Sequence, residues 1–375
     1  MGVRVLRIPN EALHDIDAVI DLTPFDGAAA SGLVSRNRGL DRSPSFSVIE
    51  SVPRERVAMK TINTVTGTTS PEQLGTTLMH EHLLIGWAGW ELDCAAPKFE
   101  RKAALKNCVE RLKEVRDLGL ETFVDPCPMD IGRDVNFMAE VASASGVKII
   151  CATGLYKEDL GNTAYFKQRT VDDIAAVYVS EINKGIDDTG IKAGIIKCAT
   201  GKGQVTKYEE MCLRAAARAQ KTTGVPITTH TEDGTMGREQ LDIFASEGVD
   251  MKSVIIGHSC GSSDLSYHVA MLDRGCTLGF DRFGLDFIHP DKLRLAALIG
   301  LLGVGYESQL VLSHDTVACW LGRGLDLTPE TAKLVANWTP THVFKNIVPA
   351  LKRAGVGDAK IRAMLVENPR RYFQN

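Results

Sequence analysis

The sequence predicts an α/β fold of the (β/α)8 TIM-barrel class. Two observations support this prediction: short β-branched runs recur from Gly75 onward, and longer amphipathic runs that end at glycine separate them. Eight such strand–helix units over roughly 250 residues is the number that closes a parallel barrel. A doubly wound open sheet is the competing fold, but no Gly-rich phosphate loop opens a helix here.

The predicted strands are short, and successive side chains should lie on opposite faces of each. They cover residues 76–82, 122–125, 148–154, 193–200, 226–230, 253–258, 276–281 and 309–315. The helices between them are predicted from apolar residues at helical spacing. The first contains Ala103, Leu105, Val109, Leu112, Val115 and Leu118 before Gly119, and others cover 171–186, 208–223, 237–247 and 264–274.

Residues 1–58 differ from the rest of the chain. They include a Gly-Ala-Ala-Ala-Ser-Gly stretch at 27–32 and show no sustained helical or strand period. We therefore expect a flexible or weakly ordered N-terminal extension followed by one barrel domain over 59–375. A regulatory or targeting arm is the alternative for this extension.

Composition is that of an ordinary soluble globular protein, with 44% hydrophobic and 24% charged residues. A net charge of −4 gives no basic footprint for nucleic acid, and no apolar run reaches membrane-spanning length. Acids at Asp15, Asp17 and Asp21 interrupt any secretory signal. The nine cysteines form no C-x-x-C pair, which favours reduced thiols and a cytoplasmic location.

Histidines and an acid gather where predicted strands end. His80 and His82 alternate along the first strand and should share one face, while His230, His258 and Asp315 end later strands. Because barrel enzymes carry their chemistry at the carboxyl ends of strands, these side chains should converge on a divalent metal. The alternative is a set of histidines that are each satisfied by hydrogen bonds.

Lys197 is the only charged residue of an apolar strand. Burial would lower the pKa of its ammonium and give a neutral amine that can add carbon dioxide. The resulting carbamate could bridge two metal ions. A lysine that extends to the barrel mouth or pairs with a carboxylate is the alternative.

Taken together, these motifs resemble the phosphotriesterase family of the amidohydrolase superfamily over about Gly75 to Asn375. The matching stretches are Met-His-Glu-His at 79–82, the Lys197 strand, Thr-Thr-His at 228–230, Ile-Gly-His at 256–258 and His-Asp at 314–315. The resemblance implies a binuclear centre of two divalent ions, with zinc the first choice and iron, cobalt or manganese as alternatives. It places one ion on His80, His82 and Asp315, and the other on His230 and His258. An N6-carboxylated Lys197 and a hydroxide would bridge the ions, and Asp315 would accept a proton.

The loops are similar to those of the lactonase branch of this family. The resemblance implies that Tyr156 and Arg282 contact the substrate, and we expect Phe283, Trp87 and Trp320 to line its pocket. A salt bridge from Arg282 to Asp281 or Asp286 is the alternative role of that arginine. The expected substrate is a small lactone or carboxylic ester, with organophosphate triesters as a secondary substrate, and the expected assembly is a homodimer.

Two alternatives concern function. The chain could be a phosphotriesterase proper (an aryldialkylphosphatase), or a catalytically inactive barrel that only binds metal.

One difference from the family pattern bears on the phosphotriesterase alternative. The family often has an aspartate three residues after the strand 6 histidine, but Gly261 stands there. Asp264 either replaces this acid or caps the next helix, and Cys260 is expected to be a bystander.

Overall fold

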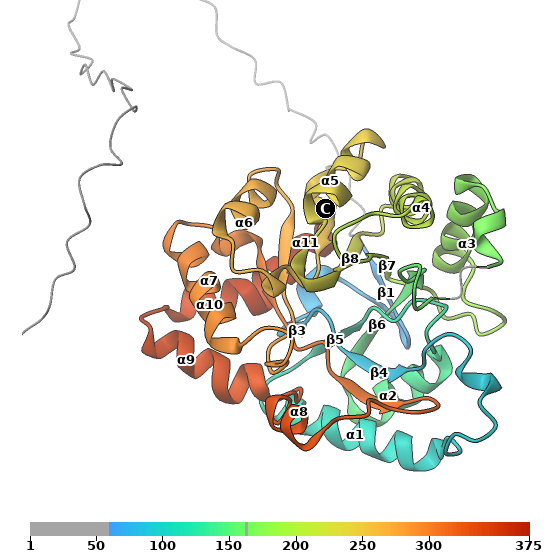
Figure 1. The fold of residues 1–375 in the computed structure, drawn as a ribbon, viewed down its shortest axis with the longest axis horizontal. Coiled ribbons are helices and arrows are strands. Elements are labelled where there is room, and N and C mark those ends of the chain that lie inside the picture. Colours follow the sequence, from blue (N-terminus) through green and yellow to red (C-terminus); the bar gives the residue numbers. More distant parts are fainter. Residues whose placement is uncertain (1–59, 162–163) are drawn as a thin grey trace, which may run out of the picture. The chain divides into compact units, whose positions relative to one another are not determined.

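The computed structural model describes residues 60–161 and 164–375, and the predicted extension of residues 1–58 lies outside them. Within the described residues, eight parallel strands form one sheet that is nearly closed into a barrel (Figure 1). Their order is β11-β10-β9-β8-β7-β6-β5-β3, so that each strand lies beside its neighbour in sequence. The predicted (β/α)8 class is therefore confirmed.

The strands of this sheet agree with the predicted set, with the best agreement at 122–125 and 148–154. Their bounds are β3 (Thr77–Leu78), β5 (Thr122–Asp125), β6 (Lys148–Gly154), β7 (Ile195–Thr200), β8 (Ile227–Thr231), β9 (Val254–Ile256), β10 (Thr277–Phe280) and β11 (Leu310–Leu312). A hairpin of β1 (Ile62–Thr64) and β2 (Gly67–Thr69) precedes them.

The first and last predicted strands differ from the structure, because each is interrupted. Residues 76–82 contain β3 and only the start of β4 (His82–Ile85), and residues 309–315 end beyond β11 and before β12 (Val317–Trp320). Asp315 lies in the second interruption with a φ of 57°, a left-handed conformation that no strand contains. β4 and β12 pair in parallel, and the Asp315 amide donates to the His80 carbonyl at 3.0 Å. These contacts bring the first and last strands together.

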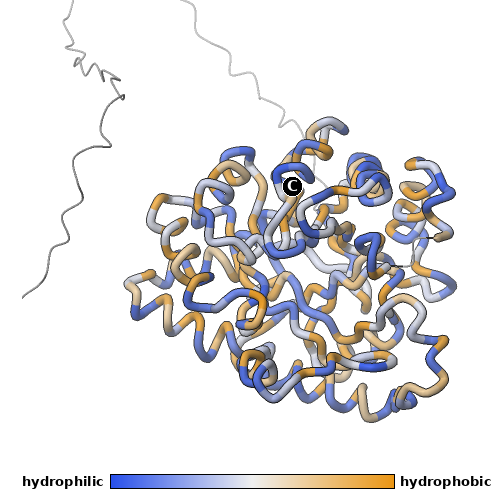
Figure 2. Tube along the Cα trace, in the orientation of Figure 1, coloured by the Kyte–Doolittle hydropathy of each residue, from blue (hydrophilic) through white to orange (hydrophobic). Residues whose placement is uncertain are grey.

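Helices surround the sheet. The longer ones are α1 (Arg101–Asp117), α2 (Val135–Ser145), α3 (Val171–Asn183), α4 (Lys207–Thr223), α5 (Gly237–Ser246), α6 (Leu265–Leu272) and α7 (Asp291–Gly303). Shorter ones follow: α8 (Pro329–Leu334), α9 (Val348–Arg353), α10 (Asp358–Arg362) and α11 (Asn368–Gln374). Hydrophobic and hydrophilic residues alternate along the outer helices (Figure 2). None of the helices in the described part of the chain has the length and apolar character needed to cross a membrane.

Local signals explain where these helices start and stop. Thr206 accepts a hydrogen bond from the Glu209 amide in a capping box at the start of α4. The same helix ends at Gly224, whose φ of 72° is accessible to glycine without strain. This end agrees with the helix predicted over 208–223 and with the rule that the amphipathic runs end at glycine.

The strands present two apolar faces. Val124, Ile150, Ile195, Ile255 and Val311 belong to an inner cluster that also contains Tyr372 and Phe373 of α11. Their sequence neighbours belong to the larger cluster, which packs the strands against the helices. Since Ile195 faces inward and Ile196 outward, the alternation directs Lys197 into the barrel.

Candidate metal centre

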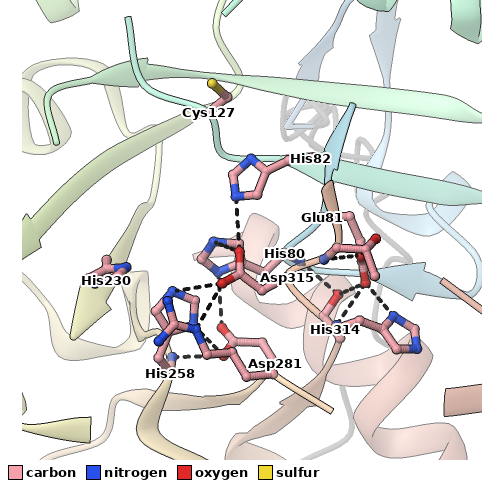
Figure 3. Close-up of polar contacts among 12 residues, drawn as sticks. His80, Glu81, His82, Cys127, His230, His258, Asp281, His314 and Asp315 are labelled. Carbon is pink, nitrogen blue, oxygen red and sulfur yellow. Dashed lines mark hydrogen bonds and ion pairs between the residues drawn. The ribbon is translucent and has the colours of Figure 1, made fainter. Parts of the chain in front are cut away.

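Side chains from the first, middle and last strands meet at the carboxyl end of the barrel. The Lys197 Nζ lies 3.0 Å from His80 Nε2. The Asp315 Oδ1 lies 3.1 Å from His82 Nε2 and 3.5 Å from His80 Nε2. Figure 3 shows Asp315 between the imidazoles. The structure thus brings together four of the six residues that the sequence singled out as ligands.

The other two predicted ligands lie on the far side of Asp315. His258 Nε2 is 3.6 Å from Asp315 Oδ2, and the His230 ring stacks edge-on against the His258 ring at 4.6 Å between centroids. His230 is held by Tyr156, whose hydroxyl is 3.3 Å from Nδ1, and by Glu232, whose carboxylate is 3.1 Å from Nε2. Both ring nitrogens of His230 therefore have polar neighbours.

Carboxylates behind the histidines orient the rings. The Asp281 oxygens lie 3.1 Å from His80 Nδ1 and 2.9 Å from His258 Nδ1, and Asp125 Oδ1 lies 3.2 Å from His82 Nδ1. An Nδ1–H that donates to a carboxylate leaves the Nε2 lone pair free toward the centre. Asp125 and Asp281 were not predicted as site residues, although Asp125 ends β5 and Asp281 directly follows β10.

This arrangement fits divalent cations. Three compact groups lie within 4.8 Å among the described residues: His80, His82 and Asp315; His80, His258 and Asp281; and His82, Asp125 and Cys127. His230 belongs to none of these three groups. The Nε2 atoms of the buried histidines face the Asp315 carboxylate. When these nitrogens carry no proton, both sides are hydrogen-bond acceptors, and a proton or a cation must lie between them. Imidazole nitrogens with a carboxylate are typical ligands of first-row transition metals and suit calcium less well.

Lys197 is 1% exposed, and its environment sets its protonation. Burial lowers the pKa of its ammonium to about 8, although the charges of Asp315 and Asp281 oppose this shift. A minor but useful fraction of neutral amine is therefore present near neutral pH. This neutral amine is the state that can add carbon dioxide, as predicted from the sequence.

Arg282 and Tyr156 border the same centre. Arg282 Nε donates to Asp315 Oδ2 at 2.9 Å, so its ion pair differs from the alternative pairing with Asp281 or Asp286. Burial raises the pKa of Tyr156 well above that of a free phenol and keeps it a neutral hydrogen-bond donor. Both side chains can therefore donate hydrogen bonds into the cavity.

The cavity above the centre opens to solvent and has about 690 Å³ of empty space including its mouth. Trp87 and Trp320 line it as predicted, with ring centroids 5.7 Å apart. Phe283 does not line it, which corrects its expected role. Its side chain is fully buried in the hydrophobic cluster between the strands and the helices. Other apolar lining residues are Ile85, Ile131, Leu285, Phe287, Ile288, Val317, Leu325 and Trp338.

Glu81 and His314 form a buried cluster beside the centre (Figure 3). Glu81 Oε1 accepts from Ser313 Oγ at 2.8 Å and from His314 Nδ1 at 2.5 Å, and Thr316 donates to Oε2 through its amide at 3.0 Å. The His314 Nε2 accepts from the Val343 amide at 2.8 Å. His314 is thus a structural histidine, and the cluster holds the turn that carries Asp315.

The structure shows the role of Asp264, the residue that could have replaced the family's aspartate at the position of Gly261. Asp264 is exposed and caps α6, because its carboxylate accepts from the amides of Ser266 and Tyr267. It therefore fills the capping role, the expected alternative to a proton relay. Cys260 is fully buried and lies outside the cavity lining, which agrees with a bystander.

Comparisons with known proteins agree with this geometry. The model of the Phosphotriesterase family matches residues 60–373. A "Phosphotriesterase homology protein" of Mycobacterium tuberculosis is 38% identical over 327 residues, which cover 84% of this chain and 98% of that protein. An "Aryldialkylphosphatase" of Saccharolobus solfataricus is 34% identical over 303 residues, covering 80% of this chain and 96% of that protein.

Solved structures give the same result. An organophosphorus hydrolase from Deinococcus radiodurans superposes with a TM-score of 0.82 at 40% identity, covering 86% of this chain and 100% of that chain. A second structure has a TM-score of 0.81 at 40% identity, covering 84% of this chain and 99% of that chain. It is described as organophosphate hydrolysis activity engineered from a weak promiscuous lactonase template.

Proposed function

The chain belongs to the phosphotriesterase family of hydrolases, and from this premise we propose that it opens lactones or related carboxylic esters with the help of two divalent ions. The observation that carries the proposal is the position of Arg282 and Tyr156. Both border the cavity that contains the metal-ligand candidates, and Arg282 contacts Asp315 directly. Organophosphate triesters would be secondary substrates.

His80, His82 and Asp315 would hold one ion, His230 and His258 the other, and an N6-carboxylated Lys197 both. Such ions, zinc in the first instance and iron, cobalt or manganese as alternatives, would supply a hydroxide nucleophile at neutral pH and polarise the substrate oxygen. Side chains of the protein would accept the proton and position the substrate.

Asp315 is the proton acceptor of the proposed reaction. Its carboxylate lies within 3.6 Å of three imidazoles and is fixed by Arg282, which supports a role in accepting a proton from an attacking water among these candidate ligands. Its pKa is held well below the usual aspartate value: burial alone would raise it, but His258, His80 and Arg282 outweigh that effect. It therefore starts the reaction as the carboxylate that can accept a proton.

Arg282 and Tyr156 would act on the substrate. A guanidinium can orient the ester and stabilise the charge that develops on its oxygen, and a neutral phenol can donate to the ring oxygen of a lactone. The cavity wall is largely apolar and includes Trp87 and Trp320, whose ring centroids are 5.7 Å apart. Such a wall favours a substrate with an apolar substituent.

A substrate panel on metal-reconstituted protein tests the proposal. We expect kcat/KM to be highest for lactones, lower for aryl esters and lowest for paraoxon-like triesters. Tyr156→Phe should lower kcat/KM for lactones about tenfold, because it removes one hydrogen-bond donor. Tyr165→Phe is the matched control, since Tyr165 is exposed and lies outside the cavity lining. A higher kcat/KM for triesters than for any lactone would contradict the assignment.

The first alternative, a phosphotriesterase proper, is favoured by the names of the relatives from S. solfataricus and D. radiodurans. It predicts the reverse order in the same panel. The second alternative is a catalytically inactive metal-binding barrel, which predicts full metal occupancy and no turnover of any panel member. A cytoplasmic homodimer stays a prediction from the sequence and the family resemblance.

A further inference from the structure

Two cysteines face each other behind the wall of the cavity. Cys108 lies on α1 and Cys319 on β12, and their sulfur atoms are 3.9 Å apart. Cys108 is fully buried, whereas Cys319 is partly exposed. The pair lies outside the cavity lining, so nothing in the proposed hydrolysis uses it.

A chain of hydrogen bonds ends on the Cys319 sulfur. Arg111 Nε donates to Asn107 Oδ1 at 3.2 Å, which fixes the side-chain amide. The Asn107 amino group then donates to Cys319 Sγ at 3.4 Å and to the Ala318 carbonyl at 3.1 Å. Such donors stabilise a thiolate more than a thiol.

The two thiols differ in acidity: the pKa of Cys319 is lowered and that of Cys108 is raised. A reactive pair needs one thiol that is more easily deprotonated than the other. The contact with Cys108 and the hydrogen bond from the Asn107 amide hold the pKa of Cys319 below its usual value. The same contact and burial raise the pKa of Cys108. Cys319 is therefore the accessible nucleophile, and Cys108 is the protonated partner behind it.

We propose that Cys108 and Cys319 are a redox-active pair that a hydroperoxide converts to a disulfide. The Cys319 thiolate attacks the terminal peroxide oxygen, the O–O bond breaks, and an alcohol or water leaves once protonated. The Cys108 sulfur then attacks the resulting sulfenic acid, the S–S bond forms and water leaves. Two thiols are oxidised, and one peroxide is reduced.

Formation of this bond would cross-link α1 to β12, a strand next to the cavity. The sulfurs must approach from 3.9 Å to about 2.05 Å, through rotation of the two side chains together with any adjustment of α1 and β12 that the bond geometry requires. Trp320 follows Cys319 and lines the cavity, and β12 is paired to β4, which begins with His82. Oxidation of this pair therefore cross-links the strand that carries Trp320, a property that goes beyond the proposed hydrolysis.

Mass spectrometry of the full chain tests the proposal without any activity assay. Metal-loaded, reduced protein is treated with hydrogen peroxide, alkylated, digested and analysed. We expect a cross-linked peptide that joins Cys108 to Cys319 and disappears after treatment with dithiothreitol. Exposed Cys94 serves as the internal reference, because it can be oxidised but has no partner in this pair.

Single variants separate the two roles. In Cys108→Ser, or Cys108→Ala if the first does not fold, Cys319 should accumulate as a sulfenic acid that dimedone traps. In Cys319→Ser, Cys108 should stay reduced. The proposal is overturned if Cys94 becomes oxidised while the pair remains reduced. It is also overturned if wild-type Cys319 becomes sulfinic acid without any cross-link to Cys108.

Discussion

Asp315 is the residue on which the site converges. It contacts His80, His82, His258 and Arg282, and it adopts a left-handed φ of 57° that a non-glycine residue rarely takes. Such a conformation persists when the surroundings over-determine it. The buried Glu81 cluster supplies these surroundings, because Glu81 binds Ser313, His314 and Thr316 on both sides of Asp315.

Lys197 gives a prediction at the same scale. Its pKa falls from 10.5 to about 8 on folding, so between these values the unfolded chain binds a proton that the folded chain does not. The metal-free, uncarboxylated protein should therefore be destabilised by about 3 kcal/mol below pH 8, and it should regain this stability as the pH rises from 8 toward 10.5.

Urea unfolding of metal-free wild type and Lys197→Met in buffers free of carbon dioxide measures this effect. The variant should be more stable at pH 7, and the difference should shrink above pH 8. Lys192→Met at an exposed position is the control and should show no such trend. A difference that stays constant from pH 7 to pH 10 would contradict a buried, titrating Lys197.

At the scale of the elements, the strands supply the chemistry and the helices supply rigidity. Lys197 and His230 lie within β7 and β8, whereas Asp281 and Asp315 stand just after β10 and β11. The helices start at capping residues, such as Thr170 of α3 and Thr206 of α4, that lie outside the cavity lining. Changes at helix starts should therefore affect stability far more than catalysis.

Asp264 at the start of α6 tests this separation. Asp264→Ala should lower the free energy of unfolding by about 1 kcal/mol, because the amides of Ser266 and Tyr267 lose their acceptor. The value of kcat should change little. Asp264→Ser is the matched variant, since serine restores the cap but carries no acid. If both variants lose kcat to the same extent, Asp264 is a relay acid after all.

At the scale of the whole molecule, the centre joins elements that are remote in sequence. The candidate ligands come from the interrupted first and last strands, from β7 and β8, and from the turn after β9. The barrel closes where β4 pairs with β12, next to the same centre. An ion that binds only the folded chain would therefore stabilise the entire barrel.

Metal removal should reveal this coupling. Prolonged chelation should lower the free energy of unfolding by about 3–4 kcal/mol relative to protein in which free metal exceeds its dissociation constant 100- to 1,000-fold. Calorimetry and metal analysis together measure the effect, and adding metal back should reverse it. Lys197→Met should show a smaller difference between the two states. Equal unfolding midpoints with and without bound metal would contradict the proposed centre.

The sequence by itself determined the fold class, because its repeat of short strands and amphipathic helices predicts the barrel. Alternation in β7 placed Lys197 on the inner face, and histidines at strand ends identified the candidate ligands, because side-chain period and strand direction are local properties. Glycine at the end of α4 was likewise readable from the chain.

Only the tertiary structure decided which side chains meet across the barrel. Asp125 and Asp281 behind the histidines, the Arg282–Asp315 ion pair and the burial of Phe283 all depend on residues far apart in sequence. The left-handed turn at Asp315, which interrupts the last predicted strand, follows from contacts with Glu81 and its neighbours rather than from local propensity. Such contacts form only when the barrel closes. Because they join residues that are far apart in sequence, no local periodicity in the sequence predicts them.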